Sequence, residues 1–362
     1  MNLRPSSTVL AAAEGAQEAG VAGDPAVDAA DHRGMIAARG RFFGPRNVDS
    51  RTGAVDPNKI ILSWFGVSSF AMAIGGTVVL LDAWVPRGVF SGYVPTTAAE
   101  VARLRPRAIF LGHGHFDHGG DAAFIAARSN AVIVGTREMC RQIADQAPDG
   151  VRIRTRPIGD ESDPPGTRYD TRVEGIDLTV MTHVHSAPKR PERSDPSRPL
   201  LLRPGLGALI KHPTTFEDFT HFTSHVRDKQ GGTLLYQFRA GDFALTWHDS
   251  SGPIPEDAPG LVEDLRGLPA TTLQIGALQS FNQYTNGLRD PRLYIEALRP
   301  AIFAPCHHDN WLPLFTSSGD KYRAALEREI ERLEPTDRPQ VRFLADPRDY
   351  VRPDRLTFKL PQ

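Results

Sequence analysis

Short apolar runs bounded by turn residues recur along the chain from about Lys59 onward. The runs at 60–62, 69–74 and 77–82 predict three strands, because strands in globular proteins are typically short and end at turn residues. Gly75-Gly76 between the second and third runs is typical of a tight hairpin turn, in which both central residues need a positive φ. The regular part of the fold is therefore expected to open with antiparallel strands.

Strands and helices are expected to alternate after residue 97. Thr97-Ala98-Ala99-Glu100 has the residue order of a capping box, so a helix is predicted to begin there and to end before Pro106. Other patterns predict helices at 121–128, after Thr136, from Asp290 and at 320–333. They also predict strands at 108–111, 131–135, 301–305 and 341–345, and hairpins at 170–185 and 232–247.

Hairpins mixed with strand–helix units over about 300 residues indicate an α/β sandwich of two mixed sheets with helices outside, in one domain. Residues 1–57 are rich in Ala, Gly, Asp and Pro and lack sustained periodicity, so we expect an N-terminal tail or loosely docked arm there and a domain at 58–362. The proline-rich segment at about 187–229 predicts an insert over the active-site mouth.

Charge and composition restrict the partners of the chain. Lys and Arg number 42 against 43 Asp and Glu, which argues against a nucleic-acid partner and favours a small-molecule substrate that is uncharged or modestly anionic. No apolar stretch approaches the roughly 18 to 20 residues of a spanning helix, so integral membrane association is not expected. Cys140 and Cys306 give no disulfide framework. We expect a cytoplasmic protein, with export of a longer precursor left open.

The chemistry of the chain is concentrated in His113-Gly114-His115-Phe116-Asp117-His118, which directly follows the apolar run 108–111. Imidazole nitrogens and carboxylate oxygens are the ligands that borderline divalent metals prefer. Histidine is scarce in this chain, at 12 of 362 residues, and clustered imidazoles are costly to bury without a metal or other partners. The motif therefore predicts a metal site.

Three further places offer metal ligands, each at the end of a predicted strand. His183 and His185 point to the same side of a strand, because side chains alternate between faces. Asp249 ends a second strand, and His307 and His308 follow a third. The residues alone leave the choice within each histidine pair open.

The segment 113–120 resembles the HxHxDH signature of the metallo-β-lactamase superfamily. The order of the later features, from a strand ending in Asp82 through a single His and an Asp-containing turn to a final His, resembles it as well. The Gly-Gly-Thr-Leu-Leu stretch before Asp249 and the Pro-x-His at 305–307 look most like the branch that contains ascorbate-6-phosphate lactonase and N-acyl-phosphatidylethanolamine phospholipase D. The resemblance implies a four-layer αββα sandwich.

The resemblance also implies a dinuclear site. Its cofactors would be two divalent metal ions, zinc or alternatively manganese, with a bridging hydroxide as nucleophile. One ion would be held by His113, His115 and His185 and the other by Asp117, His118 and His307, with Asp249 between them. His185 is preferred to His183 because Ser186 follows it, as in this branch, and His307 is preferred to His308 because it lies two residues after Pro305.

Other residues are expected to support the reaction. Asp82 would accept a proton from a ligand imidazole, and His248, which stands where the superfamily usually has a small residue, would lie behind the ligands or crowd the pocket. Asp117 would orient the nucleophile, and His308 would donate a proton to the leaving group. Asn282 and Tyr284 follow a predicted strand and are expected to contact the substrate.

The sequence thus predicts a metal-dependent hydrolase of a lactone, another ester or a phosphodiester. The alternatives are an iron-dependent redox enzyme on the same scaffold and a nuclease. His115 counts against the first alternative, because the diiron reductases of the superfamily carry a carboxylate there. The balanced charge counts against the second.

Overall fold

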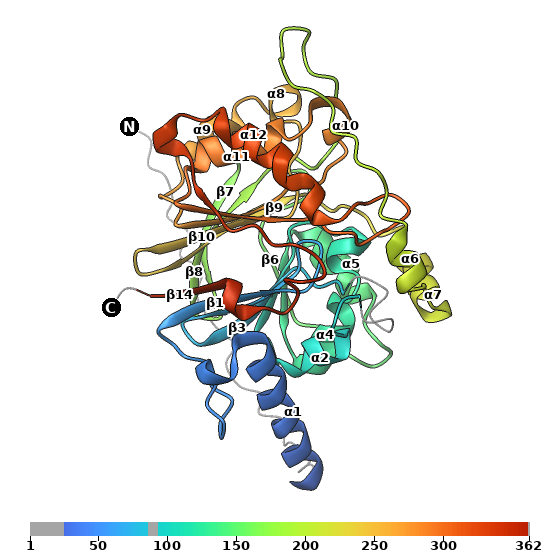
Figure 1. Cartoon of the computed structure of the whole chain (residues 1–362). Helices are drawn as coiled ribbons and strands as arrows, with labels where there is room; N and C mark the ends of the chain where they lie inside the picture. The colour runs from blue at the N-terminus through green and yellow to red at the C-terminus, as the bar shows by residue number, and fades with distance from the viewer. Residues whose placement is uncertain (1–24, 86–92, 361–362) are drawn as a thin grey trace, which may run out of the picture.

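The computed structural model describes residues 25–85 and 93–360, and it arranges them as two mixed β-sheets with helices on their outer faces (Figure 1). The sheets lie in the middle of Figure 1, with α8, α9, α11 and α12 above them and α2, α4 and α5 below and to the right. The predicted fold class, an αββα sandwich, is confirmed. Within the described residues, no helix is both long and apolar enough to cross a membrane.

The first sheet has seven strands in the described part of the chain. In spatial order they are β14 (Leu356–Lys359), β1 (Lys59–Trp64), β2 (Phe70–Ile74), β3 (Thr77–Leu81), β4 (Ala108–Phe110), β5 (Val132–Gly135) and β6 (Thr155–Pro157). The strands from β14 to β3 pair in antiparallel fashion, and those from β3 to β6 are parallel. The predicted hairpin is confirmed: Ile74 pairs with Thr77, and Gly75 and Gly76 both have positive φ.

The second sheet also has seven strands among the described residues. In spatial order they are β13 (Gln340–Val341), β12 (Ile302–Cys306), β11 (Leu273–Ala277), β10 (Phe243–His248), β9 (Leu234–Ala240), β8 (Ile176–Thr182) and β7 (Arg168–Val173). The strands from β7 to β10 are antiparallel, and those from β10 to β13 are parallel. Each sheet therefore has a parallel part, and the carboxyl ends of parallel strands meet at one edge.

The described α-helices vary from one to five turns. They are α1 (Pro25–Phe43), α2 (Ala98–Arg103), α3 (Phe116–Gly119), α4 (Ala122–Ser129), α5 (Arg137–Asp145), α6 (Gly207–Lys211), α7 (Phe216–His225), α8 (Ile254–Asp257), α9 (Leu261–Arg266), α10 (Gln283–Asn286), α11 (Arg289–Leu298) and α12 (Arg323–Glu331). The two predicted threonine caps are confirmed, since the Thr97 side chain accepts a hydrogen bond from the Glu100 N–H and that of Thr136 from the Met139 N–H. Short 3₁₀ turns occur at 45–47, 319–322, 335–337 and 353–355.

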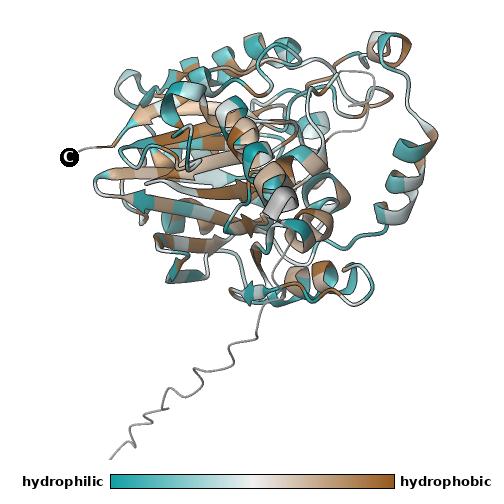
Figure 2. Ribbon diagram, turned by 90° about the horizontal axis from the view of Figure 1, so that it is seen from below, coloured by the Kyte–Doolittle hydropathy of each residue, from teal (hydrophilic) through white to brown (hydrophobic). Residues whose placement is uncertain are grey.

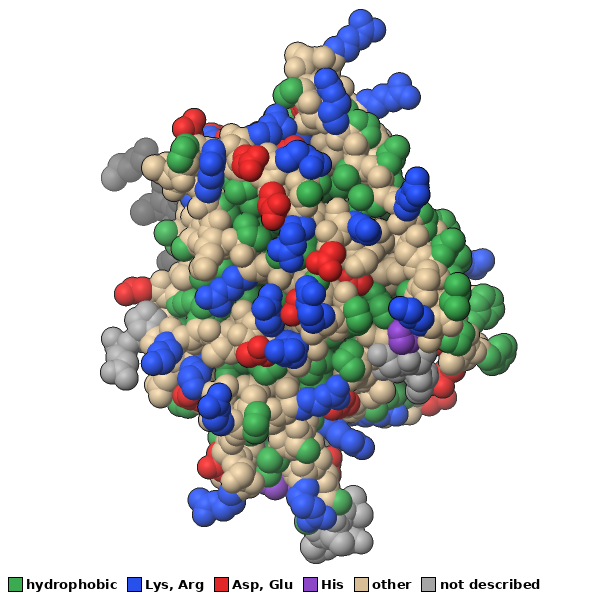
Figure 3. Space-filling view, viewed as in Figure 1, with side chains coloured by type: hydrophobic (Ala, Val, Ile, Leu, Met, Phe, Trp, Pro, Cys, Tyr) green, Lys and Arg blue, Asp and Glu red, His purple; other side chains and the backbone are tan. Residues whose placement is uncertain are grey.

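The main core lies between the two sheets. The Phe110 ring of β4 packs edge-on against Phe238 of β9, with ring centroids 4.9 Å apart, and Trp247 of β10 stacks on Tyr236. Figure 2 shows the same layering, because the strands in the middle of the molecule are mainly brown or pale and the teal segments lie toward its outside. On the face seen in Figure 3, Lys and Arg side chains are spread over the surface with Asp and Glu between them.

The segment before β1 differs from the sequence expectation. A loosely docked arm is expected there, but the described part forms α1, and Phe42 and Phe43 at its end are fully buried in the main core. The Arg39 guanidinium donates hydrogen bonds to the carbonyls of Leu104 and Gly53. The sequence gives no signal for this helix because its buried residues, among them Met35 and Ala38, leave almost no helical periodicity. The first 24 residues of the expected tail lie outside the described residues.

The predicted insert at 187–229 connects β8 to β9 and contains α6 and α7. Thr215 and Asp218 form a capping box at the start of α7. The Phe222 ring of α7 meets the Phe116 ring edge-on, with centroids 5.1 Å apart. The insert therefore reaches the segment that carries the histidine motif.

We predict that replacing Phe42 with Ala lowers the free energy of unfolding by about 3 kcal/mol, because the substitution leaves a cavity in the core. Urea denaturation measures this change. The matched control is Phe216→Ala, since Phe216 is 84% exposed and its loss should change the free energy by less than about 0.5 kcal/mol. Equal effects of the two substitutions would mean that α1 is not part of the folding unit.

Candidate metal centre

The histidine motif occupies the loop that leaves β4 and enters α3. His115 is the N-cap of this helix, and Asp117 and His118 lie in its only turn, with the His118 N–H donating to the His115 carbonyl at 3.0 Å. His113 precedes the helix and is buried. This short loop and turn bring four possible ligand side chains close together within six residues.

Three other ligand candidates reach the same place from the second sheet. His185 follows β8, Asp249 follows β10 and His307 follows β12. Because β10, β11 and β12 are parallel neighbours, their carboxyl ends open at one edge of the sheet, next to the loop from β4. The seven residues form three overlapping groups, in each of which the possible ligand atoms lie within 4.8 Å of one another: His113, His115 and His185; His113, His118 and Asp249; and Asp117, His118 and His307.

The two open choices of histidine are separated by the geometry. His185 lines the pocket, whereas His183 is buried beside it and its Nδ1 lies 2.8 Å from the Tyr294 hydroxyl. His307 lines the pocket, whereas His308 points into the core. The preferred member of each pair is therefore the one that lies with the motif.

Burial sets the protonation state of three of the histidines. It lowers the pKa of His113 and of His115 to about 4, and that of His185 to about 3, because a charged imidazolium is poorly solvated there. These imidazoles are neutral at neutral pH. Neutral imidazole is the form that binds a metal ion.

His118 is surrounded by carboxylates. Its Nδ1 lies 2.7 Å from Asp82 Oδ2 and 3.2 Å from Asp249 Oδ2, and its Nε2 lies 3.4 Å from Asp117 Oδ2. Burial alone would lower the pKa of His118, but these three carboxylates outweigh it and raise this pKa well above its ordinary value. The surroundings of His118 therefore favour a positive charge at this point.

The three carboxylates around His118 differ in their pKa. Burial would raise the pKa of Asp117 and of Asp249, but the neighbouring histidines hold both well below the ordinary value, so both stay ionised. Burial, together with the charge of Asp249, raises the pKa of Asp82 to about 7. Buried negative charge therefore exceeds what His118 can offset.

Asp249 Oδ1 and His307 Nδ1 are buried without a hydrogen-bond partner among the described residues. The donor set and its charge fit divalent cations.

Asp82 lies directly behind the ligand loop. Its Oδ2 accepts a hydrogen bond from the Ser68 hydroxyl at 2.5 Å in addition to contacting His118, and its Oδ1 accepts one from the Gly112 N–H at 3.1 Å. Asp82 therefore joins the backbone of the ligand loop to a ligand imidazole, which fixes the orientation of that ring.

Gly112 is required by the approach of Asp249. A Cβ atom at position 112 would lie 2.1 Å from the Asp249 carboxylate carbon and from its Oδ2, which is far inside van der Waals contact. The absence of a side chain at Gly112 therefore lets the carboxylate from the second sheet reach the motif on the first.

The backbone is strained at His307 and at Val67, which contacts it. Val67 and His307 both have positive φ, at 48° and 51°, and this is unfavourable for residues other than glycine. The His307 N–H donates to the Val67 carbonyl at 2.7 Å, and the Val67 N–H donates to both carboxylate oxygens of Asp309 at 3.1 Å. The Tyr350 hydroxyl also donates to Asp309, at 2.5 Å. Asp309 thus stabilises the strained loop on which His307 depends.

Three residues with expected roles do not lie in the pocket. His308 is fully buried, its Nε2 lies 2.7 Å from the Leu344 carbonyl and its ring stacks on Trp64, so it cannot donate a proton to a leaving group in this arrangement. The Asn282 amide is buried and donates to Asp290, which is a contact inside the fold. His248 lies behind Asp249, with its Nδ1 2.8 Å from the Ser250 carbonyl, and does not crowd the pocket.

A pocket of 620 Å³ opens above the ligand cluster. Its described lining contains neither Lys nor Arg, and its large side chains are apolar or aromatic. These are Phe116, Val226, Phe281, Tyr284, Trp311, Leu312 and Phe315. Of these residues, only Tyr284 is expected from the sequence to contact a substrate. The Trp311 ring lies edge-on to that of His307, with centroids 5.7 Å apart, but the sequence gives no signal for Trp311 or for Val226, which comes from the insert.

Comparisons with known proteins agree with this geometry. The model of the metallo-beta-lactamase superfamily matches residues 62–188. A UPF0173 metal-dependent hydrolase of Pyrobaculum neutrophilum is 27% identical over 266 residues, which are 74% of this chain and 91% of that protein. A similarly named hydrolase of Pyrobaculum aerophilum is 26% identical over 291 residues, 80% of this chain and 99% of that protein. The solved structure of Igni18, a metallo hydrolase from Ignicoccus hospitalis, shares the fold, with a TM-score of 0.51 and 14% identity over 84% of this chain and 100% of that one.

We predict that Gly112→Ala weakens metal binding by about tenfold or more, because the new methyl group displaces the Asp249 carboxylate. Competition with a chromophoric chelator measures the affinity. Gly260→Ala is the matched control, since a Cβ at position 260 meets nothing within 4 Å. If both variants bind metal as tightly as the unchanged protein, Asp249 is not a ligand.

We predict that Asp309→Asn weakens metal binding and lowers the free energy of unfolding by about 1 to 3 kcal/mol. An amide offers one acceptor oxygen where the carboxylate accepts from both Val67 and Tyr350. Chelator competition and urea denaturation measure the two effects, with Asp242→Asn in an exposed turn as the control. A loss of stability without any loss of metal affinity would show that Asp309 supports the core and not the position of His307.

Proposed function

We propose that this chain, a metal-dependent hydrolase of the metallo-β-lactamase superfamily, uses two divalent metal ions to hydrolyse an uncharged ester or lactone with an apolar group. The observation that carries the proposal is the overlap of the three ligand groups. His113 and His118 each belong to two of them, which supports two neighbouring metal positions with Asp249 between them.

In this proposal His113, His115 and His185 hold one ion, while Asp117, His118 and His307 hold the other and Asp249 lies between them. Zinc suits the five imidazoles and two carboxylates, and manganese is the alternative. Two such cations, when bound, would supply a nucleophilic water at neutral pH and would polarise the carbonyl of the substrate.

The side chains of the pocket orient the reactants. Asp117 lines the pocket and is ionised, so its carboxylate accepts a hydrogen bond from the attacking water and directs it toward the substrate. The Tyr284 ring, which is 43% exposed at the mouth, contacts the part of the substrate that extends outward. His308 has no part in this reaction, because it does not reach the pocket.

The pocket wall favours an uncharged substrate with an apolar group. A phosphodiester keeps a negative charge that cationic side chains commonly bind, but the described lining offers two carboxylates, Asp117 and Asp228, and neither Lys nor Arg. The apolar wall formed by Phe281, Trp311 and Phe315 instead gains free energy by covering an acyl or aryl group. The branch that the sequence resembles contains both a lactonase and a phospholipase D, so the choice of an ester rests on the pocket wall.

We predict that the purified protein contains close to two zinc or manganese ions per chain and cleaves aryl esters with a kcat/KM that rises with acyl length. Each methylene that is buried contributes about 0.8 kcal/mol, or roughly a fourfold increase. Elemental analysis and a panel of aryl esters, lactones and bis-aryl phosphodiesters test this. His118→Ala should abolish hydrolysis, and Phe281→Ala should flatten the dependence on acyl length.

Different outcomes would contradict different parts of this proposal. Tightly bound iron with a visible absorption band would favour the redox enzyme. Faster cleavage of the phosphodiester than of every ester would contradict the assigned substrate class. Full activity in His118→Ala would mean that the metal site is misassigned.

A further inference from the structure

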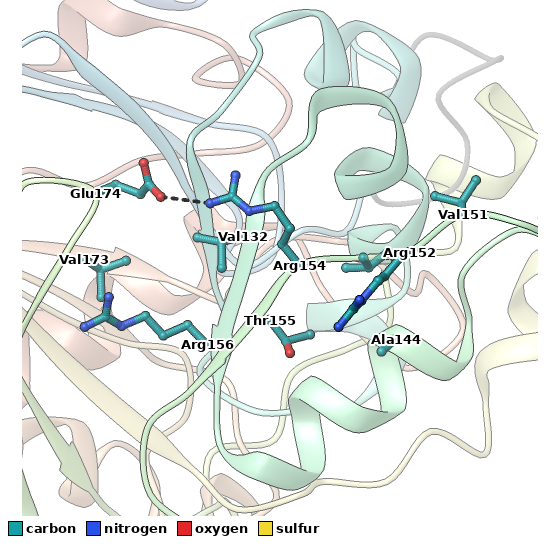
Figure 4. A pocket seen from close by; sticks show the side chains of 10 residues that line it. Val132, Ala144, Val151, Arg152, Arg154, Thr155, Arg156, Val173 and Glu174 are labelled. Carbon is teal, nitrogen blue, oxygen red and sulfur yellow. Dashed lines mark hydrogen bonds and ion pairs between the residues drawn. The ribbon is translucent and has the colours of Figure 1, made fainter. Parts of the chain in front are cut away.

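A second concave site lies away from the metal centre, at the side of the sandwich where the two sheets end. The edge strand β6 of the first sheet and the edge strand β7 of the second border an open groove of 1090 Å³. Figure 4 shows its lining side chains, among them Arg152, Arg154 and Arg156. The groove and the metal pocket have no lining residue in common.

The three arginines come from one extended segment that leads into β6. Ile153 between the first two is buried in the main core, whereas the arginines on either side of it are exposed. In an extended chain alternate residues leave the backbone on the same side, about 6.6 Å apart, so the three arginines form a row along the segment, with Arg154 directed toward Glu174 and Arg156 toward Val173 (Figure 4). A row of this spacing presents several cations to one ligand.

The positive charge of this row is not cancelled by the groove itself. Glu174 is the one acidic residue in the described lining, and it is already bound by Arg107 at 2.9 Å from outside the lining. Arg154 contacts the other oxygen of Glu174 at 3.4 Å, and Arg156 donates to the neutral Thr171 hydroxyl. Arg152 has no ion pair or hydrogen bond with any described residue.

Apolar side chains also line the groove between the charged ones. These are Val132, Ala144, Val151, Ile153 and Val173. Walls of low polarity beside charges of one sign concentrate the electric field in a cleft. Charged residues on an edge strand also prevent pairing with other chains, but that task needs neither a concave surface nor apolar side chains between the charged ones.

We propose that this groove binds a multiply charged phosphate anion through Arg152, Arg154 and Arg156. Guanidinium groups offer paired N–H donors that match two phosphate oxygens, and a row of three suits a chain of phosphates better than a single carboxylate. The site lies beyond the hydrolase function, because its residues neither line the metal pocket nor contact a ligand candidate.

The test is calorimetric titration of the metal-loaded protein with inorganic tripolyphosphate and, separately, with ATP. Polyphosphates also bind metal ions, so the readout is the difference between the unchanged protein and the double variant Arg152→Gln/Arg156→Gln, which leaves the metal centre intact. The matched control is Arg190→Gln/Arg328→Gln, which removes two exposed arginines elsewhere. All these arginines are exposed, so we expect the variants to fold, and thermal unfolding checks this.

We expect the groove variant to bind tripolyphosphate about tenfold more weakly, the control to stay within about twofold, and the difference to shrink as ionic strength rises. Tighter binding of ATP than of tripolyphosphate would identify a nucleotide as the source of the phosphates, and the reverse an inorganic polyphosphate. Equal affinity in the groove and control variants would overturn the proposal. Ester hydrolysis should be unchanged in both variants, so this result is independent of the hydrolase assignment.

Discussion

The carboxylates of Asp82, Asp117 and Asp249 surround the imidazole of His118, and this buried excess of negative charge is the constraint on which the site depends. Charges of this kind are tolerated inside a protein only when cations or hydrogen bonds offset them. The His118 imidazolium offsets one of these negative charges. The proposed divalent metal ions would offset the rest, and Asp249 Oδ1 and His307 Nδ1, which have no partners among the described residues, are placed to act as ligands.

The topology of the sheets brings these charged residues together, and hydrogen bonds hold strained backbone conformations beside them. The ligands follow the carboxyl ends of β4, β8, β10 and β12, so the two sheets must pack face to face before the cluster exists. Val67, Asp82 and His307 all have positive φ at this edge. Each is held by its neighbours: Val67 by Asp309, His307 by Val67, and Asp82 by Gly112 and Ser68. The interior of the fold thus stabilises the backbone conformations on which the ligand positions depend.

The sequence predicts the parts of this arrangement that are local. The spacing within 113–118 places four side chains on one short turn, and strand alternation narrows the next ligand to His183 or His185. Burial is a property of the folded chain, so the sequence could not show that His308 and Asn282 point into the core. For the same reason the sequence does not predict α1 and β14, because each depends on contacts that exist only in the folded chain. Ala38, Phe42 and Phe43 of α1 reach the main core but leave almost no helical periodicity in the sequence, and β14 is four residues long and pairs with β1.

The balanced charge of the chain hides two opposite environments. The metal centre, at the carboxyl end of β4, is acidic, and its described lining includes neither Lys nor Arg. The groove at the other end of the same region, bordered by Val132 at the start of β5, has three arginines against one glutamate. A net charge of −1 is the sum of such regions and describes neither of them. The two proposed ligands, an uncharged ester at the metal centre and an anion at the groove, would therefore not compete for the same side chains, because the two linings have no residue in common.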